Sequence, residues 1–89
     1  MLEKNLTLIN KRGLHARAAT RVVQVCQQFQ SQTEIRLGEK TANTRNIMQL
    51  LMLAAPCGTN ISIHASGADE EQALAALEAL ILARFDEED

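Results

Sequence analysis

Polar and apolar residues alternate in three stretches of the chain, and this period of two is typical of strands with one buried face. The stretches are "LEKNLTLIN" near the start, "TEIRLG" in the middle and "NISIHAS" at residues 60–66. Their inward-facing residues are Leu2, Leu6, Leu8, Ile35, Leu37, Ile61, Ile63 and Ala65. A fourth strand, short and polar, is expected in "GEKTANT" after a turn. His64 stands between Ser62 and Ser66 on the outward face, so we expect an ordinary exposed histidine there.

Three other stretches repeat their apolar residues at helical spacing. From Ala16 to about Gln28 the apolar stripe consists of Ala19, Val22, Val23 and Cys26, and Phe29 continues its spacing. In "NIMQLLMLAA" the stripe consists of Ile47, Leu50, Leu51 and Ala54. In the last stretch, which ends near Phe85, it consists of Ala73, Leu74, Leu77, Leu80 and Ile81. Asp69 is placed to cap this last helix, and Gln72 to reach back to it in a capping box.

The predicted order is therefore β-α-β-β-α-β-α. Strands that are polar on one face suit an antiparallel sheet with helices on its other face. We expect an α+β open-faced β-sandwich, with a four-stranded antiparallel sheet and three helices on one face. No linker, repeat or low-complexity segment divides the sequence, so residues 1–89 are expected to form a single domain.

Composition and charge exclude several classes of function. No apolar run reaches the ~20 residues of a membrane span, and the start has no signal-peptide pattern, so we expect a cytoplasmic protein without membrane insertion. Cys26 is expected in the core and Cys57 in a loop, both reduced, and no Cys/His spacing indicates a metal or a cofactor. Residues 1–45 hold eight basic against three acidic side chains, but they lack the aromatic residues and motifs of nucleic-acid modules.

The basic residues instead surround His15, which directly precedes a predicted helix in "GLHARAA". Backbone N–H groups and the helix dipole make such a helix start an anion site. A phosphate there would be bound by the amides of Ala16 and Arg17 and by the Arg17 guanidinium, while Gly13 eases the turn. No acid, serine or P-loop indicates a hydrolase or a nucleotide site, so covalent phosphoryl carriage fits better than independent turnover. An ordinary histidine beside a solvated basic face fits the spacing equally well.

The helix predicted in "NIMQLLMLAA" also carries Met48, Met52 and Leu53 outside its buried stripe. A domain of 89 residues cannot bury every side of this helix. Exposed methionines suit adaptable protein contacts, so we interpret this face as a docking surface. Any one of these residues could alternatively fill an irregular core.

These motifs together resemble a known family. "GLHAR", "NIMQLLML" and "GADEEQALAALEAL" are similar to the HPr-like phosphocarriers of phosphoenolpyruvate-dependent phosphotransferase systems, over essentially the whole chain. The resemblance implies that His15 accepts a phosphoryl group from an enzyme I-type protein and passes it to a histidine of an enzyme IIA-type acceptor. It implies phosphate contacts at Ala16 and Arg17, and a monomer. The partner surface that it implies comprises Thr20, Arg21, Ile47, Met48, Leu51 and Met52.

Two positions depart from the family pattern, one of them from that of its sugar-uptake branch. Ala18 stands where the family usually has proline, and alanine fixes the backbone less firmly than proline does. Asn46 stands where a regulatory kinase commonly phosphorylates serine, so that control is expected to be absent. Asn46, "LLMLAA" and the acidic "FDEED" look more like the nitrogen-related branch, usually called NPr. Two alternatives remain: an HPr of sugar uptake, and a regulatory module that docks through Met48 and Met52 without phosphoryl transfer.

Overall fold

The elements follow one another in the predicted order. The computed structural model describes residues 1–86. Its elements are β1 (Leu2–Thr7), α1 (Ala16–Cys26), β2 (Gln32–Leu37), β3 (Lys40–Asn43), α2 (Ile47–Met52), β4 (Asn60–Ser66), α3 (Glu70–Leu82) and the short 3₁₀ turn η1 (Arg84–Asp86). The polar stretch that was expected to form a short strand is β3.

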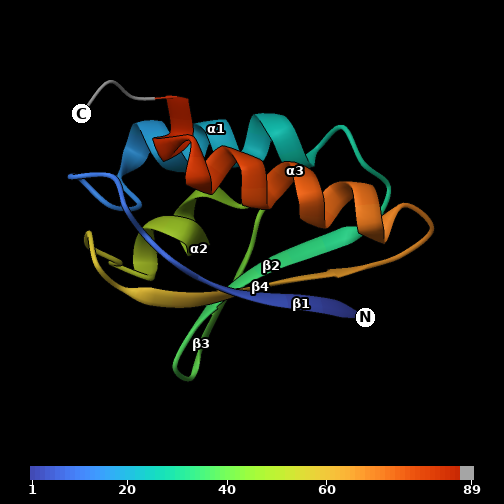
Figure 1. The fold of residues 1–89 in the computed structure, drawn as a ribbon, viewed down its shortest axis with the longest axis horizontal. Coiled ribbons are helices and arrows are strands. Elements are labelled where there is room, and N and C mark those ends of the chain that lie inside the picture. The colour runs from blue at the N-terminus through green and yellow to red at the C-terminus, as the bar shows by residue number, and fades with distance from the viewer. Residues whose placement is uncertain (87–89) are drawn as a thin grey trace.

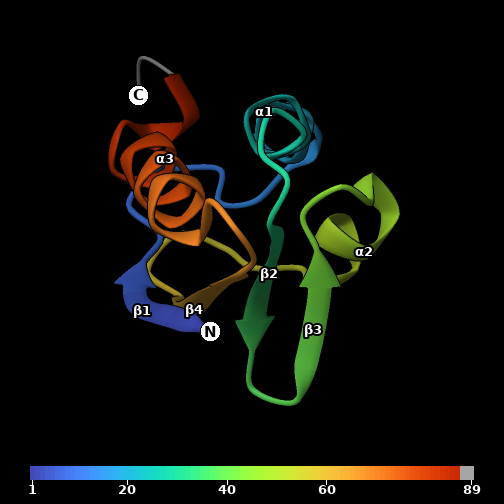
Figure 2. The same cartoon turned by 90° about the vertical axis from the view of Figure 1, so that its right-hand side faces the viewer.

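The four strands form one antiparallel sheet in the order β1-β4-β2-β3. β4 is an inner strand, and Ile63 at its middle pairs with Lys4 of β1 and Ile35 of β2. The three helices lie on one side of the sheet (Figures 1 and 2). The predicted α+β open-faced sandwich is therefore confirmed.

The core lies between the sheet and the helices and is almost entirely aliphatic. Its largest fully buried side chains are those of Phe85, Leu8, Ile35, Leu50, Ile63, Leu77 and Ile81. Cys26 is buried within it and Cys57 is exposed in a loop, as the sequence predicts. Lys4 points to the helix side of edge strand β1, where its ammonium lies 2.8 Å from Glu78 of α3. An inward-directed charge of this kind protects a sheet edge against further strand pairing.

The expectation of an exposed His64 is wrong, because its side chain is only 5% exposed. Its strand is one of the two inner strands, and in the sheet register His64 lies between Glu3 of β1 and Glu34 of β2. Residues of both neighbouring strands flank the ring on this face, on which no helix of residues 1–86 packs (Figure 2). The ring Nε2 lies 3.0 Å from the Ser62 hydroxyl. Alternation along one strand does not reveal how many strands flank it.

The second helix differs from its prediction at three residues. Leu53, expected outside the stripe, is 2% exposed, whereas Ile47 is 38% exposed and Ala54 is exposed too. For Leu53 and Ala54 the cause is the end of α2, where their amides bond to carbonyls three residues back. Such 3₁₀ bonds tighten the last turn and rotate the following side chains away from the α-helical period. Ala54 then adopts a left-handed φ of +51°.

The first helix is shorter than predicted. It ends at Cys26, and Phe29 lies half-buried in the turns that follow.

The predicted capping box at the start of α3 is also wrong. Asp69 makes no side-chain cap bond to the helix. Its carboxylate instead accepts hydrogen bonds from the Gln30 and Ser31 amides, at 3.0 and 2.8 Å, and from the Ser31 hydroxyl. These bonds, chiefly that from the hydroxyl, lower the pKa of Asp69 below its usual value. Glu70 reaches back instead, accepting from the Gly67 amide at 3.2 Å.

Candidate functional site

Gly13 determines how the chain enters α1. Its φ is +62°, and a Cβ added to it would lie 2.2 Å from the Ala55 carbonyl oxygen and 2.7 Å from the Pro56 Cα. Because both neighbours are backbone atoms, they cannot move aside as a flexible side chain would. The turn before His15 therefore requires glycine for its conformation and for the close approach of residues 55–56.

His15 is the N-cap residue of α1. Its backbone is extended, with φ −90° and ψ −178°, and its carbonyl accepts the first helical hydrogen bond from the Ala19 amide at 2.8 Å. The imidazole does not cap the helix, and the side chain is half-buried. Helix formation thus uses the backbone of His15 and not its ring.

The first turn of α1 has the geometry of an anion site. Ala16 and Arg17 are its first two residues, both exposed, and the turn contains no acidic side chain. Their amides belong to the four N–H groups that a helix leaves without intrahelical partners, at its positively polarised end. Within residues 1–86, no hydrogen bond or ion pair holds the Arg17 side chain. Ala18 is fully buried beneath this turn.

The next turn of α1 carries the other two polar residues of the predicted partner surface. The hydroxyl of Thr20, an exposed residue, donates to the Ala16 carbonyl at 2.9 Å. The Arg21 guanidinium donates to a carboxylate oxygen of Asp86 at 2.6 Å, and to Gln24 at 2.8 Å. Arg21 is thus engaged by the C-terminal turn η1, in contrast to Arg17.

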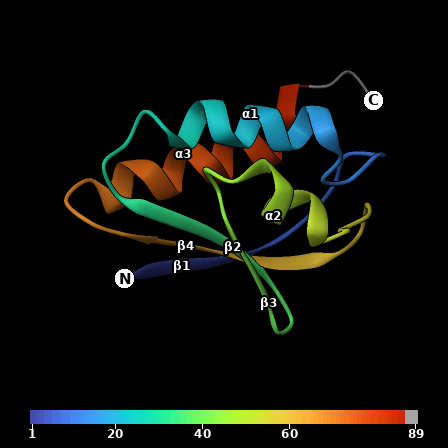
Figure 3. The ribbon, with the colours of Figure 1, turned by 180° about the vertical axis from the view of Figure 1, so that it is seen from behind.

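Helix α2 lies alongside the N-terminal half of α1 (Figures 1 and 3). It presents apolar side chains to solvent. Met48 is 67% exposed and Met52 70% exposed, while Leu50 is fully buried and anchors the helix. Leu51 is half-buried. The Asn46 side chain caps α2 by accepting from the Gln49 amide at 3.1 Å. We call the apolar residues Ile47, Met48, Leu51 and Met52 the α2 surface.

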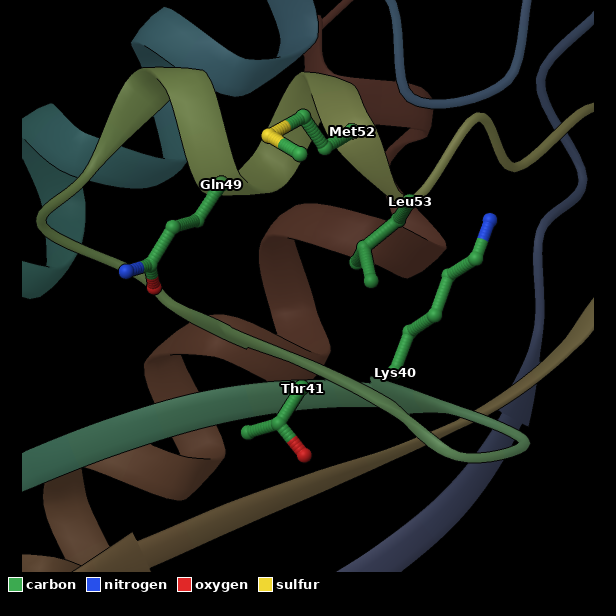
Figure 4. A pocket seen from close by; sticks show the side chains of 5 residues that line it. All are labelled: Lys40, Thr41, Gln49, Met52 and Leu53. Carbon is green, nitrogen blue, oxygen red and sulfur yellow. The ribbon is translucent and has the colours of Figure 1, made fainter.

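A pocket of about 400 Å³ lies between α2 and β3, lined by Lys40, Thr41, Gln49, Met52 and Leu53 (Figure 4). It contains none of the residues of the predicted phosphate site and shares only Met52 with the α2 surface. Among residues 1–86, no helix is long and apolar enough to cross a membrane.

A family model described as "PTS HPr component phosphorylation site" matches residues 2–83. The chain belongs to the HPr family. It is 40% identical to phosphocarrier protein HPr of Cupriavidus necator over 98% of both chains. It is 42% identical to phosphocarrier protein NPr of Shewanella violacea, over 97% of this chain and 94% of that protein. The solved HPr structure from Thermoanaerobacter tengcongensis has a TM-score of 0.94 at 38% identity, with both chains fully covered. This chain is thus a phosphocarrier protein of the HPr family, and it resembles relatives called HPr and NPr to a similar degree.

Sequence reasoning missed two parts of this site. Asn10 is fully buried and bonds to Gly13, and the Ala55 carbonyl accepts from the Leu14 amide at 2.9 Å. A local signal existed for Asn10, because Asn followed three residues later by Gly is typical of a type I turn. No local signal existed for Ala55, which lies far from Leu14 along the chain.

Proposed function

We propose that His15 carries a phosphoryl group, which it accepts from an enzyme I-type protein and passes to a histidine of an enzyme IIA-type protein. The observation that carries this proposal is the position of His15 at the positive end of α1, directly before two exposed first-turn amides and the Arg17 side chain. Backbone amides at a helix start and a guanidinium are donors from which phosphate oxygens readily accept hydrogen bonds. The family match supplies the reaction class.

Each transfer exchanges one N–P bond for another. A His15 ring nitrogen attacks with its lone pair while the donor's N–P bond breaks, and the bonding pair returns to the donor ring. Negative charge spreads over the three phosphoryl oxygens during transfer. The Ala16 and Arg17 amides and the Arg17 guanidinium would stabilise that charge. No oxidant, metal or cofactor enters this exchange.

Partner proteins would dock on the α2 surface together with Thr20 and Arg21. An exposed apolar surface beside a polar rim is the usual composition of a protein interface. The apolar residues of this surface, Met48 and Met52 above all, cost free energy in water and are covered by a partner. We expect the chain to work as a monomer, although one HPr from Thermoanaerobacter tengcongensis is described as a dimer.

Within the family we favour the nitrogen-related branch. Asn46 caps α2 through its side-chain oxygen and has no hydroxyl that a kinase could phosphorylate. The control by serine phosphorylation that the resemblance associates with the sugar branch is therefore expected to be absent. Asn46, "LLMLAA" and the acidic end "FDEED" support this assignment.

The test is phosphorylation by purified enzyme I proteins of both branches with phosphoenolpyruvate. We expect an intact-mass increase of one phosphate that acid removes, faster with the nitrogen-related donor. The His15→Ala variant is expected to fold normally and to gain no phosphate, whereas His64→Gln is expected to be labelled like the native protein. Labelling of His15→Ala would refute the site. Lack of labelling by either donor would favour a binding module without phosphoryl transfer.

A further inference from the structure

Asn10 holds both backbone groups of Gly13. The Asn10 carbonyl accepts from the Gly13 amide at 3.2 Å, and the Asn10 side-chain Nδ2 donates to the Gly13 carbonyl at 2.8 Å. Asn10 is fully buried, and Lys11 and Arg12 form the exposed turn between the two residues. One buried side chain thus closes the turn that leads into α1.

The Gly13 carbonyl is also bonded to His15. The His15 amide donates to it at 3.0 Å, so this oxygen accepts from both the Asn10 side chain and the His15 backbone. A carbonyl oxygen has two lone pairs, and here both have donors. A chain of two hydrogen bonds therefore runs from a buried amide to the backbone of the histidine at the site.

Two further contacts leave this turn little freedom. The Leu14 amide donates to the Ala55 carbonyl at 2.9 Å, and Gly13 is packed too tightly against residues 55–56 to accept a Cβ. The Gly13 carbonyl is oriented by Asn10 from the core side. Without the Asn10 side-chain donor, the Gly13 carbonyl would keep the bond from the His15 amide but lose the one from the core side.

We infer that Asn10 is a positioning residue for phosphoryl transfer, setting the backbone of His15 through the Gly13 carbonyl; this rests on the proposed function of His15. Displacement of a reacting group by about 1 Å can cost about a hundredfold in rate. Because Asn10 is fully buried, it does not contact a docked partner directly. Its loss therefore lowers kcat and leaves the KM for the carrier unchanged.

The experiment compares Asn10→Ala and Asn10→Asp with the native protein. The phosphoryl donor is an enzyme I protein that phosphorylates the native protein. We expect kcat to fall about tenfold to a hundredfold in Asn10→Ala at unchanged KM. Asn10→Asp keeps the size but offers no donor when ionised. A protonated carboxyl donates again, so the rate of Asn10→Asp relative to the native protein is expected to rise as pH falls from about 8 to about 5.

The matched control is Thr44→Val, which breaks the buried hydrogen bond between the Thr33 and Thr44 hydroxyls in another part of the fold. It is expected to lower the melting temperature without changing kcat. The inference would be overturned if kcat were unchanged in Asn10→Ala, or if only KM changed in that variant. It would also be overturned if Thr44→Val lost as much kcat as Asn10→Ala, or if both Asn10 variants failed to fold.

Amide hydrogen exchange separates this inference from the function on which it rests. Exchange of the His15 amide is expected to quicken in Asn10→Ala while that of Ile63 in β4 stays unchanged. Unchanged His15 exchange would refute the positioning role even in the absence of a donor protein. Failure of the native protein to accept phosphate would instead refute the proposed function.

Discussion

At the scale of single residues, Gly13 is constrained both by its left-handed backbone and by its close neighbours. Gly13 and Gly38 have nearly the same φ, +62° and +61°. A Cβ on Gly13 would collide with the backbone of residues 55–56, whereas one on Gly38 would meet nothing within 4 Å. The two positions therefore separate the cost of a left-handed backbone from the cost of a steric collision.

We predict that Gly13→Ala destabilises the protein by more than about 2 kcal/mol, because the collision adds to the strain of a positive φ. Gly38→Ala is expected to cost only about 1 kcal/mol, from the backbone alone. Urea unfolding of both variants measures the difference. Equal destabilisation would show that residues 55–56 move aside easily.

Arg17 is expected to act on the transferred group and not on stability, since its side chain is exposed. We predict that Arg17→Ala slows phosphoryl transfer at least tenfold, because a charge-assisted contact contributes about 1.5–3 kcal/mol. Its melting temperature is expected to stay close to that of the native protein. Arg36→Ala, which removes the same charge from the open face of the sheet, is the control for net charge. Equal rates in the two variants would exclude a contact between Arg17 and the phosphoryl group.

At the scale of elements, helix α2 combines one buried anchor with an exposed apolar side. Leu50 is fully buried, and Met48 and Met52 are more than two-thirds exposed. A six-residue helix has too few turns to bury a complete stripe against the sheet. Its exposed side is therefore available to partners at no cost to the core.

We predict that Met48→Glu leaves the fold intact and raises the apparent KM for the carrier, through lost apolar contact and an unpaired charge in the interface. Leu82→Glu is the matched control, because Leu82 is 53% exposed but lies at the end of α3. The apparent KM of both variants is measured by steady-state phosphoryl transfer from enzyme I. Unfolding of Met48→Glu, or an equal rise in KM for Leu82→Glu, would contradict the α2 surface as a docking site.

At the scale of the whole molecule, Asp69 joins segments that are distant in sequence. Its carboxylate lies at the start of α3 and accepts three hydrogen bonds from Gln30 and Ser31, which directly precede β2. These bonds lower the pKa of Asp69 in the folded protein. Ionised Asp69 therefore stabilises the fold above the pKa of the unfolded chain, and this contribution is lost as pH falls through the lower folded pKa.

We predict that Asp69→Asn is less stable than the native protein at neutral pH and that the two converge below about pH 4. Melting temperatures measured from about pH 7 to about pH 2 test this. Asp86→Asn is the control, because Asp86 pairs with Arg21 at the surface and exposed pairs contribute little. A difference between Asp69→Asn and the native protein that does not change with pH would contradict the role of the Asp69 carboxylate.

Local patterns were sufficient to predict the elements and the position of His15 at a helix start. Alternation and helical spacing depend on which side chains can share a face, and neighbours in sequence decide that. The positions of His15, Ala16 and Arg17 at a helix start followed for the same reason, because a helix creates its own donors at its first turn. The requirement for glycine at position 13 was visible as a turn residue, but its steric cause was not.

Only the tertiary structure decided which surfaces are covered. His64 is buried because β4 is an inner strand, Leu53 is buried because α2 ends in a tight turn, and Asp69 binds Ser31 instead of capping its own helix. Asn10 and Ala55 hold the His15 turn through partners that packing brings together. The reason is physical: secondary structure arises from contacts a few residues apart, whereas burial and hydrogen-bond satisfaction depend on segments that meet only when the chain has folded.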